Sequence, residues 1–226
     1  MIAADPDGVA QPPEDPYFVS LGPTLAGREA GQSARDAAEN LRAAAPWRAW
    51  VARVAGLHTD ERAWRKGARG EQLVARELAK LPPDRWFAFH DIPIGERGAN
   101  VDHLVIGQGG VFSLNAKNLS GTVWVAERAL LHNGHRTDFL PKARQEASRV
   151  SKLLSRALGR PVPVRGVLVV MCERISIKAE PADVKIVTRS RVAKWLGEQP
   201  LRLSRHEAIE IAGKAHQPAT WGARRQ

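Results

Sequence analysis

The stretch from Asn100 to Asn118 constrains the fold of this chain more than any other. Its sequence, NVDHLVIGQGGVFSLNAKN, contains two runs that alternate between apolar and polar residues, at 101–106 and 111–117. A period of two is typical of β-strands with one buried face. The four residues between the runs, 107–110, include three glycines and form a turn. We therefore predict an antiparallel hairpin in the middle of the chain.

The register of this hairpin brings polar residues together. A loop at 107–110 sets Leu104 opposite Ser113 and Asp102 opposite Asn115, and Lys117 shares the face of Asn115 because side chains alternate along a strand. A charged cluster on a mostly apolar sheet face lowers stability unless its members are paired or bind a ligand. This cost is the first indication of a functional site.

The composition favours an anionic partner. The chain has 226 residues, 43% of them hydrophobic, and a net charge of +10. Residues 1–24 hold four acids and no Lys or Arg, so the remainder is more basic than the whole. A basic body suits nucleic acid or an anionic membrane surface. The alternative is a general Arg- and Ala-rich composition without such a partner.

The chain divides into four predicted segments. Residues 1–24 are acidic and Pro-rich and form a disordered tail. Residues 25–58 form a helical extension, in which Trp47 and Trp50 begin an apolar stripe. Such a stripe more often packs on its own domain, but it could also contact a partner or a membrane surface. Residues 59–215 form the main domain, and 216–226 a loose basic tail.

The expected location is the cytoplasm. The sequence has no run of about 18 apolar residues that could span a membrane. Its first residues lack the basic-then-apolar order of a secretory signal. Cys172 is the single cysteine, so no internal disulfide can form, which fits a reducing compartment.

The main domain alternates between helices and strands. We predict helices at 59–81, 141–158, 190–196 and 204–215, and strands at 86–92, 101–106, 111–117, 122–126, 129–132, 164–171 and 184–187. Residues 93–98 form a loop, and Asn133-Gly134 a tight turn. This order predicts an α/β fold with a central mixed β-sheet flanked by helices.

Two helices carry further candidate residues. Glu71 lies on the same helical stripe as Val74 and Leu78, where a carboxylate needs a cation, a metal ion or hydrogen-bond donors. An ion pair with a core Arg or Lys would satisfy it equally. In the helix at 141–158, one face carries polar and basic residues, which could follow DNA phosphates or form a solvated face: Lys142, Gln145, Arg149, Lys152 and Arg156.

The candidate residues share one chemistry. Two carboxylates, Glu71 and Asp102, with Lys117 beside them suit a hard divalent cation such as Mg²⁺ or Mn²⁺ and a water nucleophile. The lysine can orient or deprotonate that water, or stabilise developing negative charge.

The sequence resembles the nuclease-related domain (NERD), a family of the PD-(D/E)xK phosphodiesterase superfamily. The resemblance runs from Trp64 to Leu158 and rests on GARGE ending at Glu71, VDHLVIG, GGVFSLNAK ending at Lys117, and Gln145 in a later helix. It implies a restriction-endonuclease-like core, DNA processing, and a metal site made by Glu71, Asp102, position 115 and Lys117. The family's glutamine, here Gln145, would support the site or touch phosphate.

One departure from the family pattern concerns position 115, which should be Asp or Glu and is Asn115. An amide oxygen can still bind a metal ion, but the lost charge weakens Mg²⁺ binding. Glu71 could supply the second carboxylate. The leading hypothesis is therefore a metal-dependent DNA nuclease. The alternatives are a non-catalytic nucleic-acid-binding module and an adaptor that works through Trp47 and Trp50.

Overall fold

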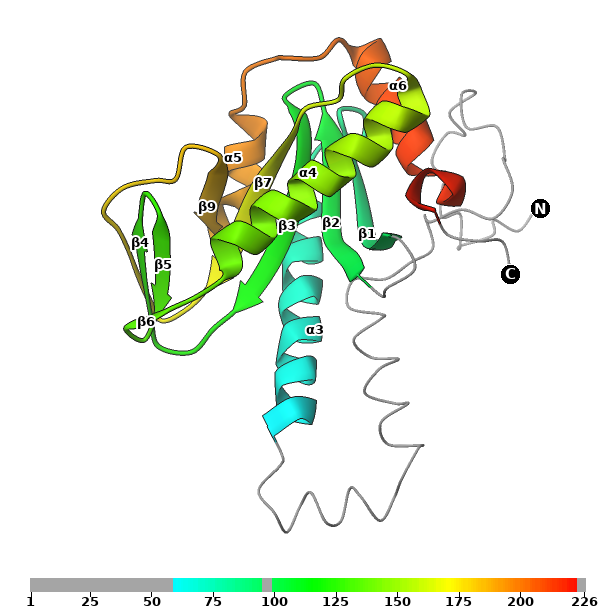
Figure 1. Cartoon of the computed structure of the whole chain (residues 1–226). Helices are drawn as coiled ribbons and strands as arrows, with labels where there is room; N and C mark the ends of the chain where they lie inside the picture. Colours follow the sequence, from blue (N-terminus) through cyan, green and yellow to red (C-terminus); the bar gives the residue numbers. More distant parts are fainter. Residues whose placement is uncertain (1–58, 95–98, 223–226) are drawn as a thin grey trace, which may run out of the picture.

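The computed structural model describes residues 59–94 and 99–222 of the chain (Figure 1). The predicted N-terminal tail and helical extension, with Trp47 and Trp50, lie outside the described residues. No helix in the described part of the chain is both long enough and apolar enough to cross a membrane.

A five-stranded mixed sheet forms the centre of the domain (Figure 1). Its order is β1 (Trp86–Ile94), β2 (Ala99–Gly107), β3 (Gly110–Asn118), β7 (Val164–Met171) and β9 (Val184–Thr188). The first three strands are antiparallel neighbours, whereas β3, β7 and β9 run parallel. Parallel strands need crossover connections; the one from β3 to β7 contains a long helix, and the one from β7 to β9 passes through a strand of a second sheet. The predicted central mixed sheet flanked by helices is thus confirmed.

Helices cover both faces of this sheet. The helices α3 (Thr59–Leu78) and α5 (Val192–Gly197) pack on one face, through Val74, Leu78 and Leu196. The helices α4 (Phe139–Leu158) and α6 (Arg205–Ala215) pack on the other face (Figure 1). A short 3-10 helix, η2 (Arg189–Arg191), links β9 to α5.

A second, smaller sheet packs beside the first half of α4. Its order is β6 (His135–Arg136), β5 (Ala129–His132), β4 (Thr122–Ala126) and β8 (Arg174–Ile177). The strand β8 was not predicted, because four residues are too few to establish a period of two. It pairs in parallel with β4, which lies about fifty residues earlier in the chain. Asn133 and Gly134 have φ of 49° and 83°, as the predicted tight turn requires.

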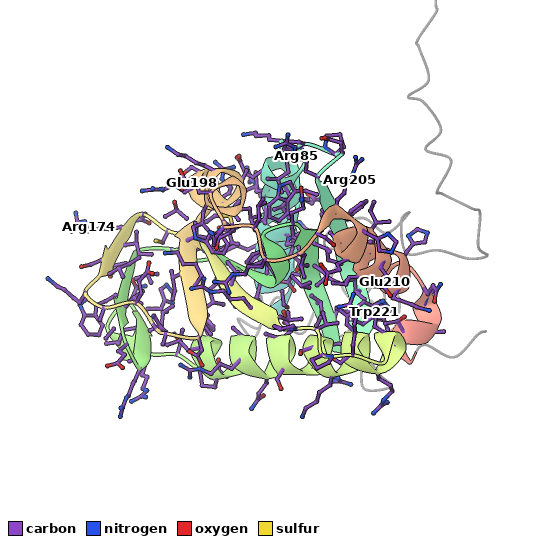
Figure 2. All side chains as sticks on the ribbon, turned by 90° about the horizontal axis from the view of Figure 1, so that it is seen from above. Arg85, Arg174, Glu198, Arg205, Glu210 and Trp221 are labelled. Carbon is purple, nitrogen blue, oxygen red and sulfur yellow. The ribbon has the colours of Figure 1, made fainter. Side chains whose placement is uncertain are left out.

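Charged side chains project from the outer surface of the domain. Figure 2 shows this for Arg85, Glu198, Arg205 and Glu210, all of them exposed. The apolar stripes of the helices face inward, and α4 buries Ala143, Ala147, Val150 and Leu154 as its sequence pattern predicts.

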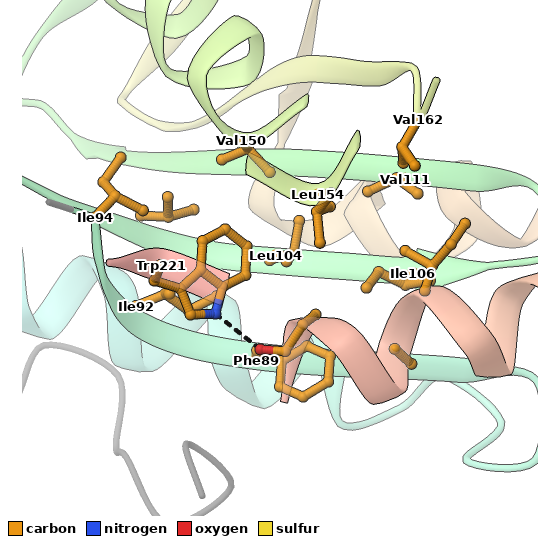
Figure 3. Close-up of a cluster of buried hydrophobic side chains, with 14 of the residues drawn as sticks. Phe89, Ile92, Ile94, Leu104, Ile106, Val111, Val150, Leu154, Val162 and Trp221 are labelled. Carbon is orange, nitrogen blue, oxygen red and sulfur yellow. Dashed lines mark hydrogen bonds between the residues drawn. The ribbon is translucent and has the colours of Figure 1, made fainter. Parts of the chain in front are cut away.

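The C-terminal segment differs from the predicted loose tail. The 3-10 helix η3 (Pro218–Trp221) follows α6, and Trp221 is buried with 1% of its surface exposed. Its indole Nε1–H donates a hydrogen bond to the carbonyl oxygen of Ala215 at 2.8 Å (Figure 3). A buried indole provides a large apolar area and has its one donor satisfied. Residues 216–221 therefore extend the core, which the short sequence pattern did not reveal.

The strand β1 is longer than predicted. It extends to Ile94, and Pro93 lies opposite Asn100 in its ladder with β2, although a loop was expected from residue 93. Proline is tolerated on an edge strand, because a residue there has no second neighbour that needs its N–H.

Candidate active site

The central hairpin has the predicted register. Leu104 lies opposite Ser113, and Gly107 pairs with Gly110, so the loop itself is only two residues long. The ladder between β2 and β3 ends at the pair His103 and Leu114. One residue further on, Asp102 no longer pairs through its backbone. Its carboxylate Oδ2 instead accepts a hydrogen bond from the backbone N–H of Ala116 at 2.8 Å.

The neighbouring ladder is interrupted at the same place. In the pairing of β1 with β2, His90 lies opposite His103 and Ile92 opposite Val101, while Asp91 and Asp102 between them are skipped. Asp91 has a φ of 50°, a conformation that is strained for a residue other than glycine. The ladder between β1 and β2 resumes at Ile92 and Val101 in the same register, whereas the ladder between β2 and β3 does not resume beyond Asp102. An interrupted ladder at a polar residue is a feature to expect at a functional site.

The half-buried carboxylate beside the hairpin comes from Glu146 on α4. Its Oε1 accepts a hydrogen bond from Ser113 Oγ at 2.5 Å, and its Oε2 accepts one from Asn115 Nδ2 at 3.1 Å. The helix thus presents a carboxylate to the strand position at which the family pattern expects one.

Gln145 was expected in this cluster, but the structure places it on the exposed face of α4 with Lys142 and Arg149. A helix turns by about 100° per residue, so adjacent residues cannot share a narrow face. Glu146 lies three residues after Ala143 and four before Val150, within the buried stripe. This spacing was readable in the sequence and identifies Glu146 as the site residue that the sequence analysis missed.

Burial and like charge raise the pKa values of both carboxyl groups. The pKa of Glu146 is raised to about 7, mainly by burial and then by the charge of Asp102. The pKa of Asp102 is also raised, again mainly by burial. Hydrogen bonds from Ser113 and Asn115 oppose the shift at Glu146 without overcoming it. The site therefore disfavours two negative charges at once, unless a cation joins them.

Lys117 is the cation that the site already contains. It follows Asn115 by two residues on β3, and its charge lowers the pKa of both Asp102 and Glu146. Its Nζ lies 5.3 Å from the centre of the Phe139 ring at the start of α4. A cation above an aromatic face is weakly stabilised, so Phe139 helps to hold the ammonium group beside the carboxylates.

Glu71 lies on the other side of the sheet from Glu146. It belongs to α3, whose buried residues pack with Val105 and Leu114 on the face opposite α4. The preceding residue, Gly70, packs closely against Asn118 at the end of β3, where an added Cβ would come within 2.9 Å of Asn118 Cβ. Glu71 is therefore carried to the same end of β3 as Lys117, and its role as a ligand stays a prediction.

The residues of this cluster fit a hard divalent cation. The amide oxygen Oδ1 of Asn115 is buried, and no described residue donates a hydrogen bond to it. Within residues 59–94 and 99–222, no group of three or more His, Cys, Asp and Glu is arranged to hold a metal ion. The donors would thus be two carboxylates and one amide oxygen. Mg²⁺ accepts such oxygen ligands and retains several waters.

The fold and the cluster together define an α/β domain with a carboxylate and lysine site at the opening of a hairpin. Residues 66–171 match the family model of the nuclease-related domain. The resemblance inferred from the sequence is confirmed for this segment, which contains Asp102, Asn115, Lys117 and Glu146. The family that this segment matches is described as nuclease-related.

The match to a curated relative is shorter. An uncharacterized protein of Bacillus anthracis is 39% identical over 67 residues, which is 28% of this chain and 32% of the relative. The chain thus spans about a third of the length of that relative. No solved structure matches the chain.

Proposed function

We propose that this domain is a metal-dependent nuclease that hydrolyses phosphodiester bonds in DNA. The supporting observation is the pair of hydrogen bonds from Ser113 and Asn115 to Glu146, because they bring a carboxylate to the strand position that lacks one. Asp102, Glu146 and the amide oxygen of Asn115 would hold Mg²⁺ or Mn²⁺. When bound, the cation would polarise a phosphoryl oxygen and lower the pKa of a bound water.

Each protein side chain has a definite task in this reaction. Hydrolysis joins a water oxygen to phosphorus and breaks the bond from phosphorus to a sugar oxygen, which gains a proton. Lys117 would orient the attacking water or stabilise the negative charge that develops on the phosphate. The hydrogen bond from Ala116 N–H fixes the carboxylate of Asp102, so its free oxygen has a defined direction.

The exposed face of α4 is the proposed contact for the DNA backbone. Lys142, Arg149, Lys152 and Arg156 are all exposed and follow one face of the helix, with Gln145 among them. Cations spaced along a helix suit a row of phosphates and give salt-dependent binding. Gln145 would then donate to a phosphate, and Glu71 would act at the same end of β3 from the opposite face, outside the ligand set of Asp102, Glu146 and Asn115.

The direct test is a cleavage assay on linear, nicked and single-stranded DNA with Mg²⁺, Mn²⁺ or EDTA. Cleavage should require the cation and should be lost in Lys117→Ala and in Glu146→Gln. Cation-dependent cleavage that survives both substitutions would contradict the proposed site.

Asn115→Asp tests the ligand set separately. A third carboxylate beside Asp102 and Glu146 should tighten Mn²⁺ binding by about tenfold, because it adds a charged oxygen donor. Calorimetric titration with Mn²⁺ measures this, and Asn118→Asp, which adds the same charge on the opposite face of β3, is the matched control. Unchanged Mn²⁺ affinity in Asn115→Asp would exclude position 115 as a ligand.

The second candidate function is a nucleic-acid-binding module without catalysis. The neutral Asn115 favours it, since one fewer charge in the site weakens cation binding. DNA binding with no cleavage under either cation, in the wild type and in Asn115→Asp, would support this function instead.

A further inference from the structure

A cavity lies at the carboxyl-terminal ends of the three parallel strands, apart from the carboxylate cluster. Its volume is about 620 Å³, within the usual range for small-ligand sites. Asn118, Met171 and Thr188 line it from the ends of β3, β7 and β9. In α/β proteins this edge of a sheet is where ligands commonly bind.

Two arginines give the cavity an excess of positive charge. Arg69 enters from α3 and Arg189 from η2, and neither forms an ion pair with any described residue. The acid at the rim is Glu173, whose Oε1 accepts a hydrogen bond from Gly121 N–H at 3.1 Å. Two guanidinium groups against one carboxylate favour an anionic ligand, and phosphate fits their planar donors.

The other walls supply hydroxyl groups and apolar surface. The hydroxyls of Thr188 and Ser190 lie 3.4 Å apart on the side of Arg189 and can donate to a phosphate. Leu73, Met171 and Ile175 form an apolar wall within the same cavity. A cavity lined by both an apolar wall and two arginines matches a molecule with one flat apolar part and one anionic part, as in a nucleotide.

The cavity adjoins the candidate active site through β3. Asn118, which lines the cavity, directly follows Lys117, and neighbouring residues of a strand point to opposite faces. One strand end therefore separates the two sites, which is a short path for a flexible strand of nucleic acid.

We propose that this cavity binds one unpaired nucleotide of the substrate strand, with its phosphate on Arg69 and Arg189 and its base on the apolar wall. This inference rests on the proposed nuclease function and names a subsite for it. It predicts that a free mononucleotide occupies the cavity without any metal ion.

Cys172 provides a reporter for the occupied cavity. It lines the cavity and is the single cysteine of the chain. The experiment measures the rate of alkylation of this thiol in the full chain, in EDTA. Because burial raises the pKa of the thiol, mildly alkaline buffer is used. The probes are thymidine 5′-monophosphate, thymidine and inorganic phosphate.

Thymidine 5′-monophosphate should slow alkylation, and at equal concentration it should protect more than either thymidine or phosphate. In Arg69→Ala and in Arg189→Ala the concentration needed for protection should rise about tenfold, the usual effect of one lost charge-assisted contact. The control is Arg205→Ala, an exposed arginine that lies across the molecule from Arg174 near the cavity (Figure 2).

Three outcomes would overturn the inference. The first is that the mononucleotide gives no protection. The second is that Arg69→Ala and Arg189→Ala are protected as well as the wild type, and the third is that Arg205→Ala loses as much protection as these two variants. Binding in EDTA does not depend on catalysis, so Lys117→Ala should keep the protection. If the mononucleotide protects Cys172 but the wild type cleaves no DNA, the cavity binds a nucleotide and the proposed nuclease function is wrong. If the wild type cleaves DNA but the mononucleotide gives no protection, the nuclease function stands and the nucleotide site in the cavity is wrong.

Discussion

The two halves of the hairpin formed by β2 and β3 share one sheet face but differ in their energetics. Near the turn, the ladder is continuous, and Leu104 and Ile106 have no exposed surface. At the open end the ladder stops, and Asp102, Asn115 and Lys117 gather around Glu146. Burial stabilises the first half, whereas in the second half it raises carboxyl pKa values. The candidate site thus lies where the β2–β3 ladder has ended and burial opposes charge on its carboxyl groups.

Lys117→Ala should have the largest effect of the substitutions in the hairpin, and it should act on catalysis. It removes the cation of the open end and should lower kcat/KM on DNA by about a thousandfold, roughly 4 kcal/mol, because charge stabilisation and water positioning are both lost. Kinetics at saturating Mg²⁺ measure the effect. The matched control is Lys194→Ala, an exposed lysine on α5, which should leave kcat/KM unchanged. If Lys117→Ala keeps its activity, the open end of the hairpin is not the catalytic site.

Leu104→Ala, near the turn of the hairpin, should lower stability and leave catalysis unchanged. Leu104 is 0% exposed, so truncation leaves a cavity and should lower the free energy of unfolding by about 3 kcal/mol. Urea denaturation measures this, and Leu201→Ala, at a leucine that is 75% exposed, should change stability by less than about 0.5 kcal/mol. The folded fraction of Leu104→Ala should keep its activity. A loss below about 1 kcal/mol would show that the turn half is not a stabilising core.

The two halves also differ in how far the sequence predicts them. The turn half follows from alternation and loop length, so its register was predicted residue by residue. The open half depends on Glu146, which belongs to a helix about thirty residues later. Glu146 faces the hairpin because it lies on the inward side of that helix. The family pattern predicts Gln145 in the site, although the helical period places Glu146 on the inward face of the helix. The interruption of the ladder at Asp91 and Asp102 and the strand β8 arise from long-range pairing, which local patterns do not encode.

Glu146→Gln should raise stability while removing the proposed metal ligand. The ordinary pKa of Glu146 is 4.5, and the folded value is about 7. Between these values the native state retains a proton that the unfolded state has lost, so stability falls as pH rises through this window. Above pH 7 the charged carboxylate is unfavourable by roughly 2 kcal/mol, given its partial exposure. A glutamine keeps a neutral side chain at every pH.

Urea denaturation without metal at pH 5 and pH 8.5 tests this sign. Glu146→Gln should match the wild type at the lower pH and exceed it at the higher pH. Glu77→Gln, at a glutamate in a helical ion pair, is the control and should show no such gain. A destabilised Glu146→Gln protein at high pH would mean that the carboxylate is structural.

A pair of histidines on the same strands makes stability depend on pH in the opposite direction to Glu146. His103 is fully buried, and its Nδ1 lies 2.8 Å from Nδ1 of His90, so one ring donates and the other accepts. Burial, and then the proximity of His90, lowers the pKa of His103 well below its ordinary 6.5. The unfolded chain therefore binds a proton that the native state does not. Stability should fall by about 1.4 kcal/mol for each pH unit below 6.5.

Glu146 and His103 act in opposite directions over the overlap of their windows, from pH 4.5 to 6.5. As pH falls there, Glu146 adds stability and His103 removes it, so the wild type should show a shallow dependence. Glu146→Gln removes the first contribution and should expose a steep loss of stability on acidification. Adding His103→Leu should flatten the curve, whereas adding His135→Leu, at an exposed histidine of β6, should leave it steep. If Glu146→Gln shows no steeper loss than the wild type, the buried histidine does not resist protonation.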